Sequence, residues 1–154
     1  MHQAVERERS AAGTPDRRTA VTRQSLAPQG VAPPQAHYSH GVMAADGTLY
    51  VAGQVPLDEH GRLVEGGAEA QTRQVLENLS RVVAAAGATL DDVVKTTVFL
   101  TSLDDREAVG RVRRSYFSDP PPANTLLVVS SLAHPGFLVE IEAIAVRRGS
   151  DGRR

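Results

Sequence analysis

Cysteine is absent from the 154-residue chain, so neither a disulfide framework nor a metal site with thiolate ligands can form. Long hydrophobic runs are also absent, because the longest, from Val82 to Ala86, is far too short to cross a membrane. The first residues, Met1 to Ala12, alternate in charge and lack the apolar segment of a secretory signal. Together these absences favour a cytoplasmic protein.

Aromatic residues are scarce, at 4% of the chain, and the formal net charge is only -1. Nucleic-acid binding usually needs a basic surface and stacking aromatic side chains, so it is not expected here. Hydrophobic residues make up 41% and charged residues 23% of the chain, as in ordinary globular domains. A chain of this length is expected to form one domain with a core of its own.

The two ends of the chain differ from its middle. Residues 1–29 are polar and charged, contain Pro15 and Pro28, and show no apolar period, which predicts a flexible N-terminal extension. Residues 148–154 predict a loose C-terminal tail. The folded domain is therefore expected over residues 30–147.

Within this domain, the spacing of apolar residues switches between that of strands and that of helices. Apolar residues between Val75 and Val83 form one helical stripe, which predicts a helix over about 68–86 that Gly87 ends. A second helix is predicted after Ser102, and three prolines from Pro120 stop it. Alternation and β-branched residues predict strands over 37–44, 49–55, 93–100, 124–130 and 137–146. The order ββαβαββ indicates an α+β fold with a mainly antiparallel sheet and both helices on one face.

The last predicted strand has two unlike faces. Alternation places Glu140, Glu142 and Ile144 on one face. The opposite face is wholly apolar and must cover the core; it consists of Val139, Ile141, Ala143 and Ala145. A partly apolar face that carries two carboxylates needs a cover, which a ligand, a partner subunit or both would supply.

Five segments, in this order along the chain, resemble the motifs of one family. They are Tyr38-Ser39-His40-Gly41-Val42, Val51-Ala52-Gly53-Gln54-Val55-Pro56-Leu57, Gln71 to Leu79, Asp92 to Leu100, and Val139 to Ala145. Together they resemble the Rid/YjgF family, the reactive-intermediate (imine) deaminases, from about Ala32 to Val146. The resemblance implies a chorismate-mutase-like fold and a homotrimer with ligand clefts between subunits.

The resemblance also implies a chemistry. Members of the family hydrolyse enamines and imines, typically 2-aminoacrylate and related 2-imino acids, to 2-keto acids and ammonia without a metal or organic cofactor. The glutamate that positions water in the family corresponds to Glu140. Tyr38, Gly53 and Gln54 correspond to residues that shape the cleft and bind the substrate.

One substrate-binding residue of the family is replaced. An arginine in a proline-alanine-arginine segment clamps the substrate carboxylate in the family, and Asn124 occupies its position here. A guanidinium forms two charge-assisted hydrogen bonds to a carboxylate, whereas an amide forms only ordinary ones. Either another arginine enters the cleft, for which Arg73, Arg113 and Arg114 are candidates, or the ligand is more neutral than a simple carboxylate. Two lesser departures are Ala52 for a common serine and Gly110 for a frequent asparagine.

Each candidate residue also has a structural interpretation. Glu140 could be a solvated strand residue, Tyr38 a packed aromatic residue, and Asn124 a polar residue at the start of a strand. His37 and His40 lie three residues apart on a predicted strand and so face opposite ways, which disfavours a metal site.

Two further groups are candidate nucleophiles. Lys95, the only lysine, could form a Schiff base if it were buried, although a lysine on a strand usually has a solvated tip. Ser39 has no evident triad partners.

Three functions remain open on the sequence alone. The first is a trimeric deaminase that hydrolyses an imine or enamine, with a pathway-specific intermediate rather than 2-aminoacrylate as one candidate substrate. The alternative is a trimer that binds a small molecule and has lost catalysis along with the arginine. The third is the ribonuclease activity ascribed to this family, which the few aromatic residues and the lack of a basic stripe disfavour.

Overall fold

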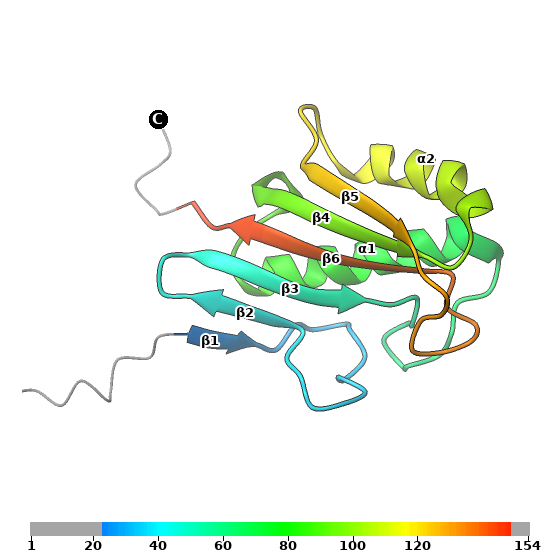
Figure 1. The fold of residues 1–154 in the computed structure, drawn as a ribbon. Coiled ribbons are helices and arrows are strands. Elements are labelled where there is room, and N and C mark those ends of the chain that lie inside the picture. Colours follow the sequence, from blue (N-terminus) through cyan, green and yellow to red (C-terminus); the bar gives the residue numbers. More distant parts are fainter. Residues whose placement is uncertain (1–22, 149–154) are drawn as a thin grey trace, which may run out of the picture.

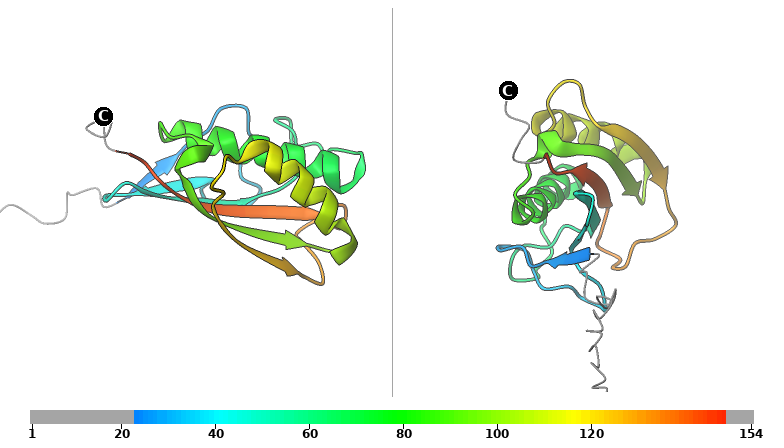
Figure 2. Two further views of the ribbon diagram at one scale, coloured as in Figure 1. Left: turned by 90° about the horizontal axis from the view of Figure 1, so that it is seen from above. Right: turned by 90° about the vertical axis from the view of Figure 1, so that its left-hand side faces the viewer.

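The computed structural model describes residues 23–148, which form one six-stranded sheet with two long helices on one face (Figure 1). The strands lie in the order β1-β2-β3-β6-β4-β5. The views in Figure 2 show α1 and α2 side by side on the same face of the sheet. The elements are β1 Arg23–Leu26, β2 Gly41–Ala44, β3 Thr48–Gln54, α1 Gly67–Ala85, β4 Val93–Leu100, α2 Arg106–Tyr116, β5 Ala123–Val128 and β6 Val139–Val146, with short 3-10 turns at Leu90–Asp92 and Leu103–Asp105.

The core lies between the helices and the sheet. The predicted apolar stripe of α1 is buried, and α2 adds Val109 and Val112. On the sheet side of the core, β6 contributes the four apolar residues that were predicted for its inner face, and all four are buried. The helix α1 ends just before Gly87, whose positive φ of 72° suits the left-handed conformation after a helix C-terminus. The α+β prediction, with two helices on one face, is confirmed.

The sheet is antiparallel at every strand pair except one. β5 runs parallel to β4, with Thr96 opposite Asn124 and Val98 opposite Leu126. A parallel neighbour requires a crossover, and α2 provides it. The prediction of a mainly antiparallel sheet therefore holds, with β5 as the exception.

Strand β1 differs from the expectation for the N-terminal extension. Arg23–Leu26 pairs with β2, Leu26 lies opposite Gly41, and only 8% of the Leu26 surface is exposed. Because β1 is four residues long and buries one side chain, its sequence shows no alternation. Residues 1–22 and 149–154, the rest of the predicted extension and nearly all of the predicted tail, lie outside the described residues.

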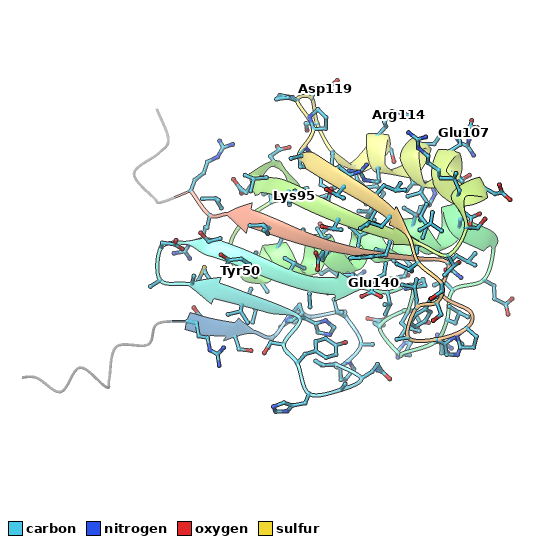
Figure 3. All side chains as sticks on the ribbon, in the orientation of Figure 1. Tyr50, Lys95, Glu107, Arg114, Asp119 and Glu140 are labelled. Atoms are coloured by element: carbon cyan, nitrogen blue, oxygen red, sulfur yellow. The ribbon has the colours of Figure 1, made fainter. Side chains whose placement is uncertain are left out.

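The sheet face opposite the helices, called the open face below, is not covered by any described element. It carries Tyr50, Lys95, Thr97, Glu140, Glu142 and Ile144. In Figure 3, Tyr50, Lys95 and Glu140 lie on this face, which is turned toward the viewer. Tyr50 keeps 53% of its surface exposed, and Leu127, opposite Phe99 on the edge strand, keeps 43%. Among residues 23–148, no helix is long and apolar enough to span a membrane.

Candidate functional site

The Glu140 side chain lies directly over Gly53 of the neighbouring strand. The ladder between β3 and β6 is irregular between Val51 and Gln54, where β3 carries an extra residue. At this bulge, a Cβ on residue 53 would collide with Oε1 of Glu140 and would lie 2.8 Å from its Cδ. Only glycine therefore leaves room for the carboxylate.

The environment of Glu140 favours its protonated form. Burial raises the pKa of the Glu140 carboxyl above its usual range, and the negative charge of Glu142 adds to the effect. No hydrogen bond or ion pair joins the carboxylate to another residue within 23–148. A half-buried carboxyl of this kind can both accept and return a proton in the course of a reaction.

Glu140 opens into a pocket of about 550 Å³, called the Glu140 pocket below. Tyr38 and Gly53 line it together with Glu140, so the structure brings three of the predicted site residues together. The Tyr38 ring meets the His40 ring edge to face, with centroids 5.8 Å apart. Apolar residues supply much of the remaining wall, including Val55, Leu57, Leu63, Ala133 and Phe137.

Gln54 lies beside this pocket but faces the interior. Only 2% of its surface is exposed, and its Nε2 donates to the carbonyl of Ala52 at 2.9 Å. A second contact, 3.4 Å long, joins Nε2 to Nδ1 of His40, whose Nε2 lies 2.7 Å from the carbonyl of Ala32. Since a carbonyl can only accept, His40 carries its proton on Nε2 and accepts at Nδ1. Gln54 therefore helps to fix the segment that carries Tyr38.

Asn124 lies on the other face of the sheet. It pairs with buried Thr96 on the helix side, whereas Glu140 pairs with Phe99 and points to the open face. Asn124 lines a second pocket of about 660 Å³ between α2 and β5, called the α2–β5 pocket below. Within one chain, Glu140 and Asn124 therefore cannot contact the same ligand.

Of the three arginines proposed as substitutes, Arg113 and Arg114 line the α2–β5 pocket. The Nη2 of Arg113 donates to Oγ1 of Thr96 at 3.0 Å, and that hydroxyl donates to Oδ1 of Asn124 at 2.8 Å. Burial lowers the pKa of Arg113 from its usual value. Arg73 instead pairs with Glu69 on α1 at 3.0 Å.

Sequence reasoning missed the segment that closes the Glu140 pocket. His134 falls between the predicted strands 124–130 and 137–146, and Phe137 falls within the second of them, yet both line the pocket. The turn is held by the backbone N–H of Gly136, which donates to Nδ1 of His134 at 2.9 Å, and the two rings lie 5.1 Å apart. No local pattern shows that this turn comes to line the same pocket as Gly53.

The remaining candidate groups occupy ordinary structural positions. The Lys95 ammonium donates to the carbonyl of Thr96 at 2.9 Å and to Oγ1 of Thr125 at 2.8 Å. Within the part of the chain that the structure describes, no three His, Asp or Glu side chains are grouped as metal ligands.

Comparisons with known proteins identify the family of the chain. Residues 29–147 match the family model described as Endoribonuclease L-PSP. The chain is 41% identical over 128 residues to the 2-iminobutanoate/2-iminopropanoate deaminase of Mus musculus, covering 82% of this chain and 90% of that protein. A RutC family protein of Pyrococcus horikoshii is 40% identical over 122 residues, covering 79% and 92%.

Solved structures show the same fold. RidA from an Antarctic Psychrobacter superposes with a TM-score of 0.76 at 36% identity, covering 80% of this chain and 99% of that one. The YjgF gene product of E. coli superposes with a TM-score of 0.74 at 32% identity, covering 81% and 99%. The fold is therefore chorismate-mutase-like, and the chain belongs to the Rid/YjgF family that its motifs resemble.

Proposed function

We propose that the protein hydrolyses an imine or enamine to a carbonyl compound and ammonia, with Glu140 acting on the attacking water. The observation that carries this proposal is the half-buried Glu140 carboxyl, with its raised pKa, above Gly53 in a largely apolar pocket. The names of the mouse and rat relatives, both 2-iminobutanoate/2-iminopropanoate deaminases, support the same reaction class.

The reaction adds water across a C=N bond. The Glu140 carboxylate accepts a proton from water while the oxygen attacks the carbon, and it passes that proton to the nitrogen. The resulting carbinolamine collapses: its hydroxyl proton moves to the departing nitrogen, the C–N bond breaks, and ammonia and a carbonyl compound are released. An enamine enters the same route after it tautomerises to the imine. Because the pKa of Glu140 is raised, the carboxyl can hold the proton between the two steps.

A homotrimer with ligand clefts between subunits is part of this proposal. Glu140 and Asn124 lie on opposite sheet faces, so one ligand can contact both only if two chains contribute. The open face supports such an assembly because it leaves Tyr50 exposed beside Glu142 and Leu127 exposed on the edge strand. A cytoplasmic location and a pathway-specific substrate belong to the same proposal.

The decisive experiment measures ammonia release from 2-aminoacrylate generated in the assay and from larger 2-imino acids. Glu140→Gln keeps the shape but cannot accept the proton, so we expect it to lose at least about a hundredfold in kcat. Glu77→Gln is the matched control, because Glu77 is exposed on α1 and pairs with Arg81. Wild-type protein that accelerates neither substrate class would contradict the proposal.

The replacement of the family arginine by Asn124 favours one second candidate, a trimer that binds a small molecule without converting it. This candidate predicts ligand binding with no turnover, and equal binding by wild-type protein and Glu140→Gln. The same assay, run beside a binding measurement, separates the two functions.

A further inference from the structure

The α2–β5 pocket has an excess of positive charge. Three arginines line it, Arg106, Arg113 and Arg114, against two carboxylates, Asp104 and Glu107. Figure 3 shows Glu107 and Arg114 on α2. Glu107 is already engaged, since its Oε1 accepts from Nη1 of Arg111 at 3.0 Å. The pocket therefore suits an anion.

Arg113 is the partly buried cation of this pocket. Its Nε is sealed from solvent and lacks a hydrogen-bond partner in residues 23–148. Within the same residues, no carboxylate lies within 4.0 Å of its guanidinium. An arginine stays protonated in a protein, and here its charge meets the face of the Phe117 ring, 5.8 Å from the ring centroid, and the Thr96 hydroxyl but no negative charge among the described residues, so an anion could still pair with it.

The hydrogen bonds around Thr96 fix which way Asn124 points. A guanidinium can only donate hydrogen bonds, so the Thr96 hydroxyl oxygen accepts the N–H of Arg113. The single hydroxyl proton of Thr96 is then donated to Oδ1 of Asn124. The Nδ2 group of Asn124 is left without a partner among the described residues. The pocket thus presents two neighbouring sets of donors, a guanidinium and an amide NH₂.

Building on the proposed function, we propose that Arg113 replaces the missing strand arginine and, with Nδ2 of Asn124, binds the carboxylate of the substrate. The substrate class then remains the anionic 2-imino acids, despite Asn124. The cation comes from the facing helix rather than from the strand, and Thr96 holds it in place.

The other two candidates are less suited to this role. The guanidinium of Arg73 is taken by Glu69 at 3.0 Å and does not line the pocket. Arg114 lines it but is exposed, so its charge is hydrated and its side chain would lose more freedom on binding.

Binding of pyruvate, a 2-keto acid of the product class, tests the assignment on wild-type protein without any substitution. Pyruvamide has the same shape but no charge. We expect pyruvate to bind at least about tenfold more tightly, because charge-assisted hydrogen bonds exceed neutral ones by about this margin. Equal affinities by calorimetry would overturn the proposal.

Variants then assign the charge to a residue. Arg113→Gln should raise the KM for a 2-imino acid and the Kd for pyruvate by at least about tenfold, with a smaller effect on kcat. Arg113→Lys should fall between Arg113→Gln and wild type, because an ammonium lacks the planar fork. Adding Asn124→Arg to Arg113→Gln should restore pyruvate binding. Arg73→Gln is the control, since Arg73 pairs with Glu69 on α1 and does not line the pocket.

The outcomes separate this proposal from the proposed function. A folded Arg113→Gln protein with unchanged KM and Kd would overturn the role of Arg113, even if Glu140→Gln abolished turnover. Conversely, a wild-type protein that binds pyruvate through Arg113 but hydrolyses no imine would support the anion site and contradict the deaminase. If Arg113→Gln fails to fold, unchanged pyruvate affinity in Arg113→Lys overturns the assignment.

Discussion

The Glu140 carboxylate occupies the space that a side chain on residue 53 would need. Gly53→Ala should therefore push the carboxylate aside, lower kcat by at least about tenfold, and reduce the free energy of unfolding by about 1–3 kcal/mol. Imine hydrolysis and urea unfolding measure the two effects. A fully active and equally stable Gly53→Ala protein would show that Glu140 does not act from this position.

Glu140 also gives the protein a dependence of stability on pH. Burial and Glu142 raise the pKa of Glu140 above 4.5, the ordinary value. Between 4.5 and the raised pKa, the folded protein binds more protons than the unfolded chain, so this group lowers stability as pH rises. Glu140→Gln should therefore unfold at higher urea than wild type at pH 7 and at similar urea below pH 4.5. A destabilised variant at pH 7 would contradict the burial of an unpaired charge.

The activity should follow the same titration. Water attack needs the ionised carboxylate, so the acid limb of kcat/KM should lie above pH 4.5. Glu142→Gln removes the neighbouring charge and should move that limb toward lower pH. A pH profile of the two proteins measures the shift, and a limb that stays in place would exclude Glu140 as the titrating base.

Thr96 links Arg113 to Asn124 through one hydroxyl group. Thr96→Val keeps the shape of this fully buried residue but removes both hydrogen bonds, which should cost about 1–3 kcal/mol of unfolding free energy. Thr97→Val, one residue further and on the open face, is the control and should change stability by less than about 0.5 kcal/mol. Urea unfolding of the two variants compares them, and equal stabilities would contradict the link.

The proposed trimer should dissociate when the open face of each subunit becomes charged. Tyr50→Glu and Leu127→Asp place carboxylates on exposed apolar positions of that face, close to Glu142 for Tyr50. Both should shift the protein from trimer to monomer in sedimentation velocity, with loss of deaminase activity. Ala84→Glu, on the exposed side of α1, should remain trimeric. A wild-type monomer that is fully active would contradict an interface site.

The regular elements could be predicted because their burial is periodic. Strand β4 has the predicted bounds, and β6 alternates between faces as predicted. Strand β1 escaped prediction because only Leu26 is buried, and β2 begins at Gly41 rather than at 37 because the preceding residues form bends.

The site was predictable in its residues but not in its arrangement. The family motifs identified Tyr38, Gly53 and Glu140, and the structure places all three in one pocket. Asn124 could not be located relative to them, because its face depends on the parallel register of β5 against β4. The choice between Arg113 and Arg114 depends on the rotation of α2 about its axis, which the sequence of a short helix with two fully buried residues does not fix.

The extra residue in β3 sets the two ends of that strand in different phase. Leu49 and Val51 reach the interior at odd positions, whereas Gln54 reaches it at an even one. A chain lacking Gly53 would pair regularly with β6, with Gln54 still inward and opposite Ile141, but it would lose the one position without a side chain that leaves room for Glu140. A redesign that removed the bulge to make this sheet regular would therefore remove the space that the Glu140 carboxylate occupies.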